Sequence, residues 1–82
     1  MTAVELFTHP TCRGCSEALS AFRELEKLGK VTLDVTSLGT PNGRRRAESV
    51  GVTSVPTLRV DNEFRELNSE TDLQDALQQF QG

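Results

Sequence analysis

The sequence predicts a single α/β domain in which a four-stranded mixed sheet carries helices on both faces. Its 82 residues suffice for one hydrophobic core. The apolar residues switch along the chain between the spacing of a strand and the spacing of a helix. With 35% hydrophobic and 26% charged residues, the composition is typical of a globular domain rather than of a disordered chain. The predicted order is β-α-β-α-β-β-α, within one domain over residues 1–82.

A short apolar segment at residues 3–8 predicts the first strand, which Pro10 ends because proline donates no hydrogen bond to a neighbouring strand. A helix over residues 12–28 is predicted next, and Gly29 is the expected cap at its C-terminal end. Apolar residues three or four positions apart form the predicted buried face of this helix: Cys15, Ala18, Leu19, Phe22, Leu25 and Leu28.

The second strand is predicted at residues 31–35, where Val31, Leu33 and Val35 share one side. Residues 36–43 hold two glycines, a proline and an asparagine, which predicts a loop. A short helix over residues 44–50 follows and is closed by Gly51. Because a helical crossover joins the first two strands, we expect them to be parallel.

The last two strands are predicted at residues 57–60 and 64–67. The three residues between them are of hairpin length, so this pair should be antiparallel. At the start of the last helix, Ser69 and Asp72 resemble a capping box in which aspartate replaces the usual glutamate. The apolar face of this helix has helical spacing: Leu73, Ala76, Leu77 and Phe80.

The charge balance excludes several classes of function. Nine Lys and Arg residues against twelve Asp and Glu residues give a net charge of −3, which argues against a general nucleic-acid binder. No stretch approaches the ~20 apolar residues of a membrane helix, and residues 1–5 lack the features of a signal peptide. We therefore expect a cytoplasmic monomer that binds neither nucleic acid nor membrane. Structural disulfides are uncommon in the cytoplasm, so the two cysteines call for a chemical explanation first.

The two cysteines, Cys12 and Cys15, lie three positions apart at the predicted start of the first helix and can close a small disulfide ring. At a helix N-terminus, unpaired N–H groups and the helix dipole favour an anion, so we expect the pKa of the Cys12 thiol to be lowered. Arg13 adds a positive charge beside it. Cys15 lies one turn further, on the apolar face, and should be more buried. The pattern predicts Cys12 as the attacking thiolate and Cys15 as the resolving thiol.

The cysteine pair has two other possible roles. A purely structural disulfide across so short a loop removes little entropy from the unfolded chain. A zinc site made of Cys12, Cys15 and His9 is one ligand short, so metal or iron–sulfur binding would require a second chain or glutathione. We therefore expect neither a metal nor another cofactor.

Two segments carry a resemblance to a known superfamily. Residues 6–15, Leu-Phe-Thr-His-Pro-Thr-Cys-Arg-Gly-Cys, resemble the beginning of glutaredoxins and small thioredoxin-like proteins. Residues 55–57, Val-Pro-Thr, are similar to the segment before the third strand of that superfamily. The resemblance covers essentially the whole chain and implies a thioredoxin-like fold of glutaredoxin size. It also implies that Pro56 follows a cis peptide bond and lies beside the cysteines, leaving the Val55 backbone free to bind an extended substrate segment.

The resemblance implies a thiol–disulfide oxidoreductase that acts on disulfide-containing proteins. The expected substrate-binding residues are Thr11, Arg13, Val55 and Pro56. Its electron donor is expected to be a protein similar to thioredoxin reductase, or glutathione.

Departures from the family pattern bear on the subfamily. Thr11 stands where thioredoxins carry Trp, and Arg13-Gly14 replaces both their Gly-Pro and the Pro-Tyr of glutaredoxins. Leu6 takes the place of a buried Asp of thioredoxins, while the adjacent Glu5 should face the opposite side of the sheet. At residues 68–70, Asn-Ser-Glu departs from the glutathione-holding pattern of glutaredoxins. These departures favour a protein-disulfide reductase; the alternatives are a glutathione-dependent glutaredoxin and a metal or iron–sulfur carrier.

Two further features of the sequence concern charge. His9, three residues before Cys12, is a candidate to support the thiolate, although a histidine in such a loop is more often simply solvated. The basic run at residues 44–46 predicts a solvated helix face, with docking of an acidic partner or of a glutathione carboxylate as the alternative.

Overall fold

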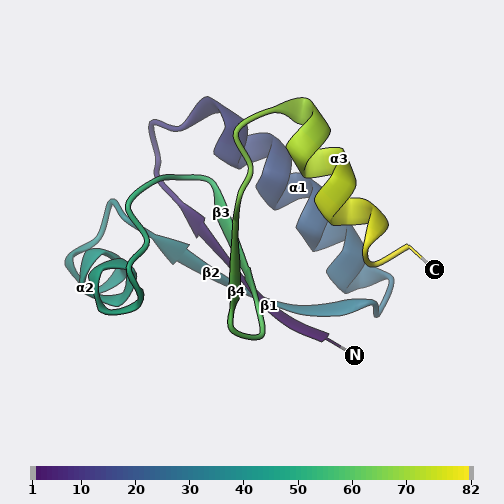
Figure 1. Cartoon of the computed structure of the whole chain (residues 1–82), viewed down its shortest axis with the longest axis horizontal. Helices are drawn as coiled ribbons and strands as arrows, with labels where there is room; N and C mark the ends of the chain where they lie inside the picture. Colours follow the sequence, from purple (N-terminus) through teal and green to yellow (C-terminus); the bar gives the residue numbers. More distant parts are fainter. Residues whose placement is uncertain (1, 82) are drawn as a thin grey trace.

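The structure is a computed structural model, and it describes residues 2–81. Figure 1 shows a twisted sheet with α1 and α3 side by side, and α2 at one end of the sheet, away from them. The sheet has four strands in the order β2-β1-β3-β4. The elements are β1 (Thr2–Thr8), α1 (Arg13–Lys27), β2 (Val31–Ser37), α2 (Pro41–Val50), β3 (Thr57–Val60), β4 (Glu63–Glu66) and α3 (Glu70–Gln78). The predicted order of elements and the mixed sheet are confirmed.

Strand β1 is one of the two inner strands of the sheet, and its side chains enter a hydrophobic core on each face. It pairs with β2 in parallel, as the helical crossover predicts, and with β3 in the antiparallel sense. Strand β4 pairs with β3 as an antiparallel hairpin. Because successive side chains of a strand alternate, Leu6 and Phe7 are both fully buried but belong to different cores.

The larger core lies between the sheet and the helices α1 and α3, and the smaller core lies under α2. In the larger core, Phe80 packs against Phe22 edge to face, with 6.0 Å between ring centres, just beyond the end of α3. The smaller core consists of Phe7, Ala47 and Val52, with Leu38, Val50 and Val55 packed around them. The buried residues of the larger core are Val4, Leu6, Ala18, Phe22, Leu25, Val31, Leu58, Leu67, Leu73, Ala76 and Leu77.

Helix α2 begins three residues earlier than predicted and β2 extends to Ser37, so the loop predicted at residues 36–43 is confined to residues 38–40. Thr40 is the N-cap of α2, and its Oγ1 accepts a hydrogen bond from the Gly43 N–H at 2.9 Å. Pro41 occupies the first helical position, where its missing N–H costs nothing. Three of the residues that indicated a loop, Pro41, Asn42 and Gly43, therefore form the first turn of a helix.

The inward face of β2 is less regular than predicted. Val31 is buried and Leu33 packs against the larger core, but Val35 is 38% exposed. Since β2 is an edge strand with a neighbour on one side only, its far end receives less cover than the central strand.

The hairpin and the cap of α3 also differ in detail from the prediction. Strand β4 begins at Glu63, so the hairpin loop has two residues, and Asp61 adopts a φ of 55°. Ser69 caps α3 as predicted, its Oγ accepting from the Asp72 N–H at 3.1 Å. The Asp72 carboxylate, however, accepts from the Asn68 N–H at 3.0 Å, one residue before the position that a capping box uses.

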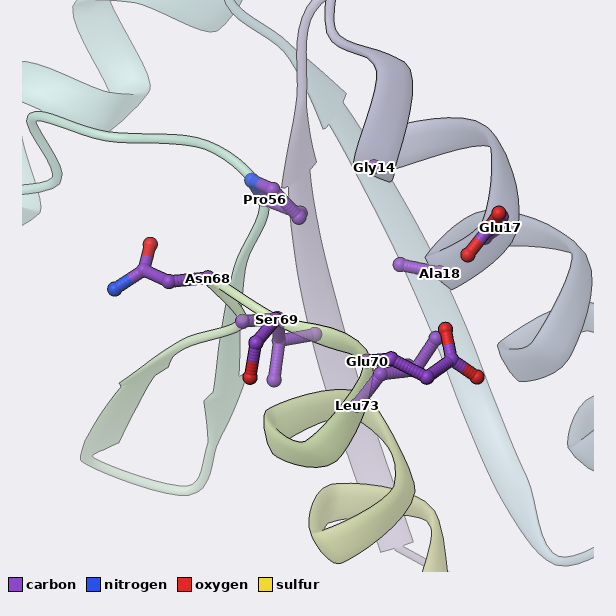
Figure 2. A pocket seen from close by; sticks show the side chains of 9 residues that line it. Gly14, Glu17, Ala18, Pro56, Asn68, Ser69, Glu70 and Leu73 are labelled. Atoms are coloured by element: carbon purple, nitrogen blue, oxygen red, sulfur yellow. The ribbon is translucent and has the colours of Figure 1, made fainter.

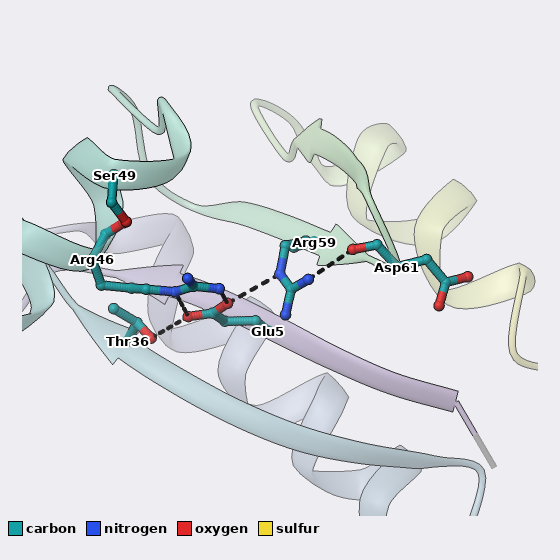
Figure 3. Close-up of polar contacts among 6 residues, drawn as sticks. All are labelled: Glu5, Thr36, Arg46, Ser49, Arg59 and Asp61. Atoms are coloured by element: carbon teal, nitrogen blue, oxygen red, sulfur yellow. Dashed lines mark hydrogen bonds and ion pairs between the residues drawn. The ribbon is translucent and has the colours of Figure 1, made fainter.

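A buried carboxylate joins α2 to the sheet (Figure 3). Glu5 points to the α2 side, opposite Leu6, as predicted. Its two oxygens accept from Arg46 at 2.9 and 3.2 Å, from Arg59 at 3.1 Å and from the Thr36 hydroxyl at 2.6 Å. The prediction of a solvated face at residues 44–46 is therefore wrong for Arg46, because the fold brings a buried acid within its reach.

The pKa of Glu5 is shifted by this environment. Burial alone would raise the pKa, but the hydrogen bonds from Arg46, Thr36 and Arg59 outweigh burial and hold the pKa below its ordinary value of 4.5. The native state then binds fewer protons than the unfolded state around that pH. Glu5 consequently contributes full stability above about pH 4.5, and this contribution is lost as the pH falls through the lower native pKa.

We expect Glu5→Gln to lower the free energy of unfolding at pH 7 by about 1–3 kcal/mol, because both arginines lose their counter-charge while remaining partly solvated. We also expect the variant to lose less stability than the wild type between pH 7 and pH 3.5. Urea denaturation at both pH values measures the two effects, with Glu63→Gln on exposed β4 as the control. Identical pH dependence in wild type and Glu5→Gln would contradict the assignment.

Candidate active site at the start of helix α1

The two cysteines form a disulfide at the first turn of α1, with 5.3 Å between their Cα atoms. Cys12 is the N-cap of α1, at the start of the helix as predicted, and its Sγ accepts from the Cys15 N–H at 3.2 Å. A sulfur in this position lies at the positive end of the helix dipole, beside amide groups that have no partner within the helix. The arrangement stabilises negative charge on Cys12 when the pair is reduced.

The two cysteines differ in exposure, as the sequence predicts. Cys15 is 4% exposed and lies on the buried face of α1, whereas Cys12 is only half-buried. A cavity of about 240 Å³ borders the disulfide; it is lined by Thr8, His9, Pro10, Cys12, Cys15, Ser16, Leu19 and Ser37. A molecule approaching from solvent therefore reaches Cys12 before Cys15.

The segment before Cys12 is held by the backbone and by His9. The Cys12 N–H donates to the His9 carbonyl at 3.0 Å. The His9 Nδ1 accepts from the Thr11 N–H at 3.2 Å and lies 2.8 Å from the Thr11 hydroxyl. The ring thus binds Thr11 and shapes the turn, and within residues 2–81 it makes no hydrogen bond to the Cys12 sulfur. Thr11 and Arg13, both predicted to bind substrate, are exposed on either side of Cys12.

Pro56 lies against the cysteine turn, as the resemblance implies. The Val55–Pro56 peptide bond is cis, and Pro56 is buried. A methyl group added at Gly14 would lie 3.7 Å from the Pro56 Cδ, so the two segments are in contact distance of each other. Gly14, for which the sequence indicated no role, is therefore the point at which the cysteine turn approaches the proline.

Hydrogen bonds on both sides hold the turn that carries Val55. The Thr57 hydroxyl donates to the Ser54 carbonyl at 2.8 Å, the Ser54 hydroxyl donates to Glu66 at 3.0 Å, and the Leu67 N–H donates to the Pro56 carbonyl at 2.9 Å. Within residues 2–81, the N–H and C=O of Val55 itself make no hydrogen bond. These backbone groups are available to an extended peptide. Nothing in the sequence pattern had indicated Ser54 or Glu66.

A second cavity, of about 270 Å³, lies where Gly14 meets Pro56 and continues between α1 and α3 (Figure 2). It brings together residues from three separate parts of the chain: Gly14, Glu17, Ala18, Pro56, Leu67, Asn68, Ser69, Glu70 and Leu73. Sequence reasoning had considered residues 68–70 only as a departure from a family pattern, and had not related them to Glu17.

Within residues 2–81, no three His, Cys, Asp or Glu side chains are grouped so that they could hold a metal ion. No helix in the same range combines the length and the apolar character that crossing a membrane requires.

The sheet order, the helices and the Pro56 contact define a thioredoxin-like fold. The structure is similar to thioredoxin O2 of Arabidopsis thaliana in the oxidized state, with a TM-score of 0.73, 20% identity, and coverage of 96% of this chain and 74% of that one. It is also similar to glutaredoxin 1 of Francisella tularensis, with a TM-score of 0.63, 18% identity, and coverage of 96% and 95%. A third similar structure is the J-Trx1 fragment of ERdj5, with a TM-score of 0.67 and 20% identity over 94% of this chain and 38% of that one. No protein-family model and no curated protein sequence matches the chain.

Proposed function

We propose that the protein is a thiol–disulfide oxidoreductase that reduces disulfides of other proteins. One observation carries the proposal: the half-buried sulfur of Cys12 caps α1, and Cys15 lies buried one turn behind it. This asymmetry separates an attacking thiolate from a resolving thiol. The likeness in fold to thioredoxin and glutaredoxin structures supports the same class of reaction.

The proposed reaction transfers two electrons in two exchange steps. In the reduced protein, the Cys12 thiolate attacks one sulfur of the substrate disulfide, and the other substrate sulfur leaves as a thiolate. Cys15 then loses its proton and attacks the Cys12 sulfur of the mixed disulfide. The second substrate sulfur leaves, the substrate is fully reduced, and Cys12 and Cys15 are joined by a disulfide.

Binding of the substrate is assigned to residues around Cys12. In the proposal, the N–H and C=O of Val55 pair with an extended substrate segment beside Pro56. Thr11 and Arg13, exposed on either side of Cys12, contact the part of the substrate nearest the reacting sulfur. We propose that the protein acts as a cytoplasmic monomer and is reduced again by a partner similar to thioredoxin reductase or by glutathione.

Reduction of insulin by dithiothreitol tests this function. We expect a micromolar amount of the protein to accelerate the precipitation of insulin chains, and Cys12→Ser to show only the rate of dithiothreitol alone. Supplying electrons from thioredoxin reductase with NADPH, or from glutathione with its reductase, then identifies the donor. We expect the first to sustain the faster turnover. Absence of acceleration, together with stoichiometric iron or zinc in the purified protein, would contradict the proposal.

A further inference from the structure

The cavity beside Pro56 combines an apolar floor with an acidic rim. Ala18, Pro56, Leu67 and Leu73 are buried and supply the floor. Glu17 of α1 and the first residue of α3, Glu70, are exposed at the rim. Figure 2 shows the two carboxylates on the same side of the cavity, extending from neighbouring helices.

No cationic side chain of the cavity lining offsets the charge of this rim. No Lys, Arg or His is among the residues lining the cavity, and neither acid forms an ion pair within residues 2–81. The Glu70 Oε1 accepts a hydrogen bond from the Gln74 Nε2 at 3.1 Å, but that donor is neutral. The cavity therefore presents two carboxylates to whatever enters it.

The amino end of α3 offsets this charge only in part. The Asp72 N–H is taken up by the Ser69 hydroxyl, whereas the N–H groups of Glu70 and Thr71 have no hydrogen-bond partner within residues 2–81. These donors give the helix end a partial positive charge, smaller than the two full negative charges of the rim.

We propose that this cavity is the subsite for a lysine or arginine side chain that lies next to the disulfide of the substrate. Such a side chain has an apolar stem, which suits the floor of Ala18, Leu67 and Leu73, and a cationic end, which suits Glu17 and Glu70. The free backbone groups of Val55 lie next to the same cavity and orient the peptide that carries the side chain. The inference rests on the proposed function and names its substrate class, disulfides in basic segments.

The test uses three peptides, each with one disulfide, that differ only in whether lysine, glutamine or glutamate follows the cysteine. We expect kcat/KM of the wild type to fall in that order, with about a threefold to tenfold difference between the lysine and glutamate peptides at low ionic strength. The difference should shrink in about 0.5 M salt because the rim is exposed.

The variant Glu17→Gln/Glu70→Gln should reduce the lysine-to-glutamate ratio to below about twofold, because both carboxylates of the rim are gone. The control, Glu48→Gln/Glu63→Gln, makes the same change of charge at exposed positions of α2 and β4 and should keep the wild-type ratio. Equal rates for the three peptides, or a preference that persists in the rim variant, would overturn the subsite.

A binding measurement separates this subsite from the proposed function. In Cys12→Ser/Cys15→Ser, the reduced lysine peptide should shift the NMR amide signals of Gly14, Glu17 and Ser69, and the glutamate peptide should not. The same shifts with both peptides, or with neither, would refute the subsite. If this variant shows the selective shifts but the wild-type protein shows no turnover with any disulfide substrate, the enzymatic function is refuted and the subsite is retained.

Discussion

Cys15→Ser is expected to turn the protein into a trap that stays covalently joined to its substrates through Cys12. The first exchange step needs only the half-buried Cys12 sulfur, whereas release of the substrate needs Cys15. Turnover should fall by at least about a thousandfold, as it does when a nucleophile that acts in concert with others is removed. Non-reducing electrophoresis of the variant with a disulfide-bonded protein should show a conjugate that dithiothreitol dissolves.

The matched control is Cys12→Ser, which keeps Cys15 in place. Cys15 is 4% exposed, so this variant should form no conjugate and should show the same loss of turnover. If Cys12→Ser forms a conjugate with the substrate and Cys15→Ser does not, then Cys15 is the attacking residue and Cys12 the resolving one. Equal trapping by both variants would mean that the difference in burial does not direct the attack.

Gly43→Ala is expected to lower the free energy of unfolding more than a glycine-to-alanine change at Gly14, Gly29, Gly39 or Gly51. A Cβ at this position would lie 1.7 Å from the Ser37 carbonyl oxygen and 2.6 Å from its carbon, both backbone atoms that belong to β2. Since a strand in the sheet has little room to shift, α2 must move away instead. We expect the free energy of unfolding to drop by about 3 kcal/mol or more.

Chemical denaturation measures this effect, and Gly29→Ala is the control. Gly29 has a φ of +75° with no atom within 4 Å of an added Cβ, so alanine there should cost only about 1 kcal/mol from backbone strain. Because Ser37 also lines the cavity beside the disulfide, Gly43→Ala should additionally slow disulfide exchange. Similar stability of the two variants would show that α2 accommodates the methyl group by a local adjustment.

Local patterns in the sequence were sufficient for much of the fold and for the two sulfurs of the site. The spacing of apolar residues in α1 predicts the buried face that contains Cys15, Ala18, Phe22 and Leu25. The prediction is wrong for Leu28, which follows the last residue of the helix as its C-cap and is 65% exposed. Ser69 as the cap of α3 and the parallel pairing of β1 with β2 follow from equally local rules. The proline of the second segment was located through a family resemblance, and its contact with the cysteine turn is confirmed by the position of Gly14.

The sequence-based prediction was wrong where the same residue type occurs in two kinds of structure and the surrounding fold decides between them. Proline, asparagine and glycine at residues 41–43 are typical of loops, but here they form the first turn of a helix. Val35 continues the alternation of a strand correctly, yet the edge position of β2 leaves it 38% exposed. The alternation of residues along a strand predicts the direction of each side chain, but it does not predict which neighbouring elements bury that side chain.

Everything that depends on one stretch of chain was determined by the sequence: the type and order of the elements, the buried face of α1, and a pair of cysteines at a helix start. Only the tertiary structure decided which distant residues meet. Glu5 finds its partners 31, 41 and 54 residues further along the chain, and Glu17 shares a cavity with Glu70. The physical reason is that backbone periodicity acts over a few residues, whereas charge pairing and cavity shape are set by how the elements pack.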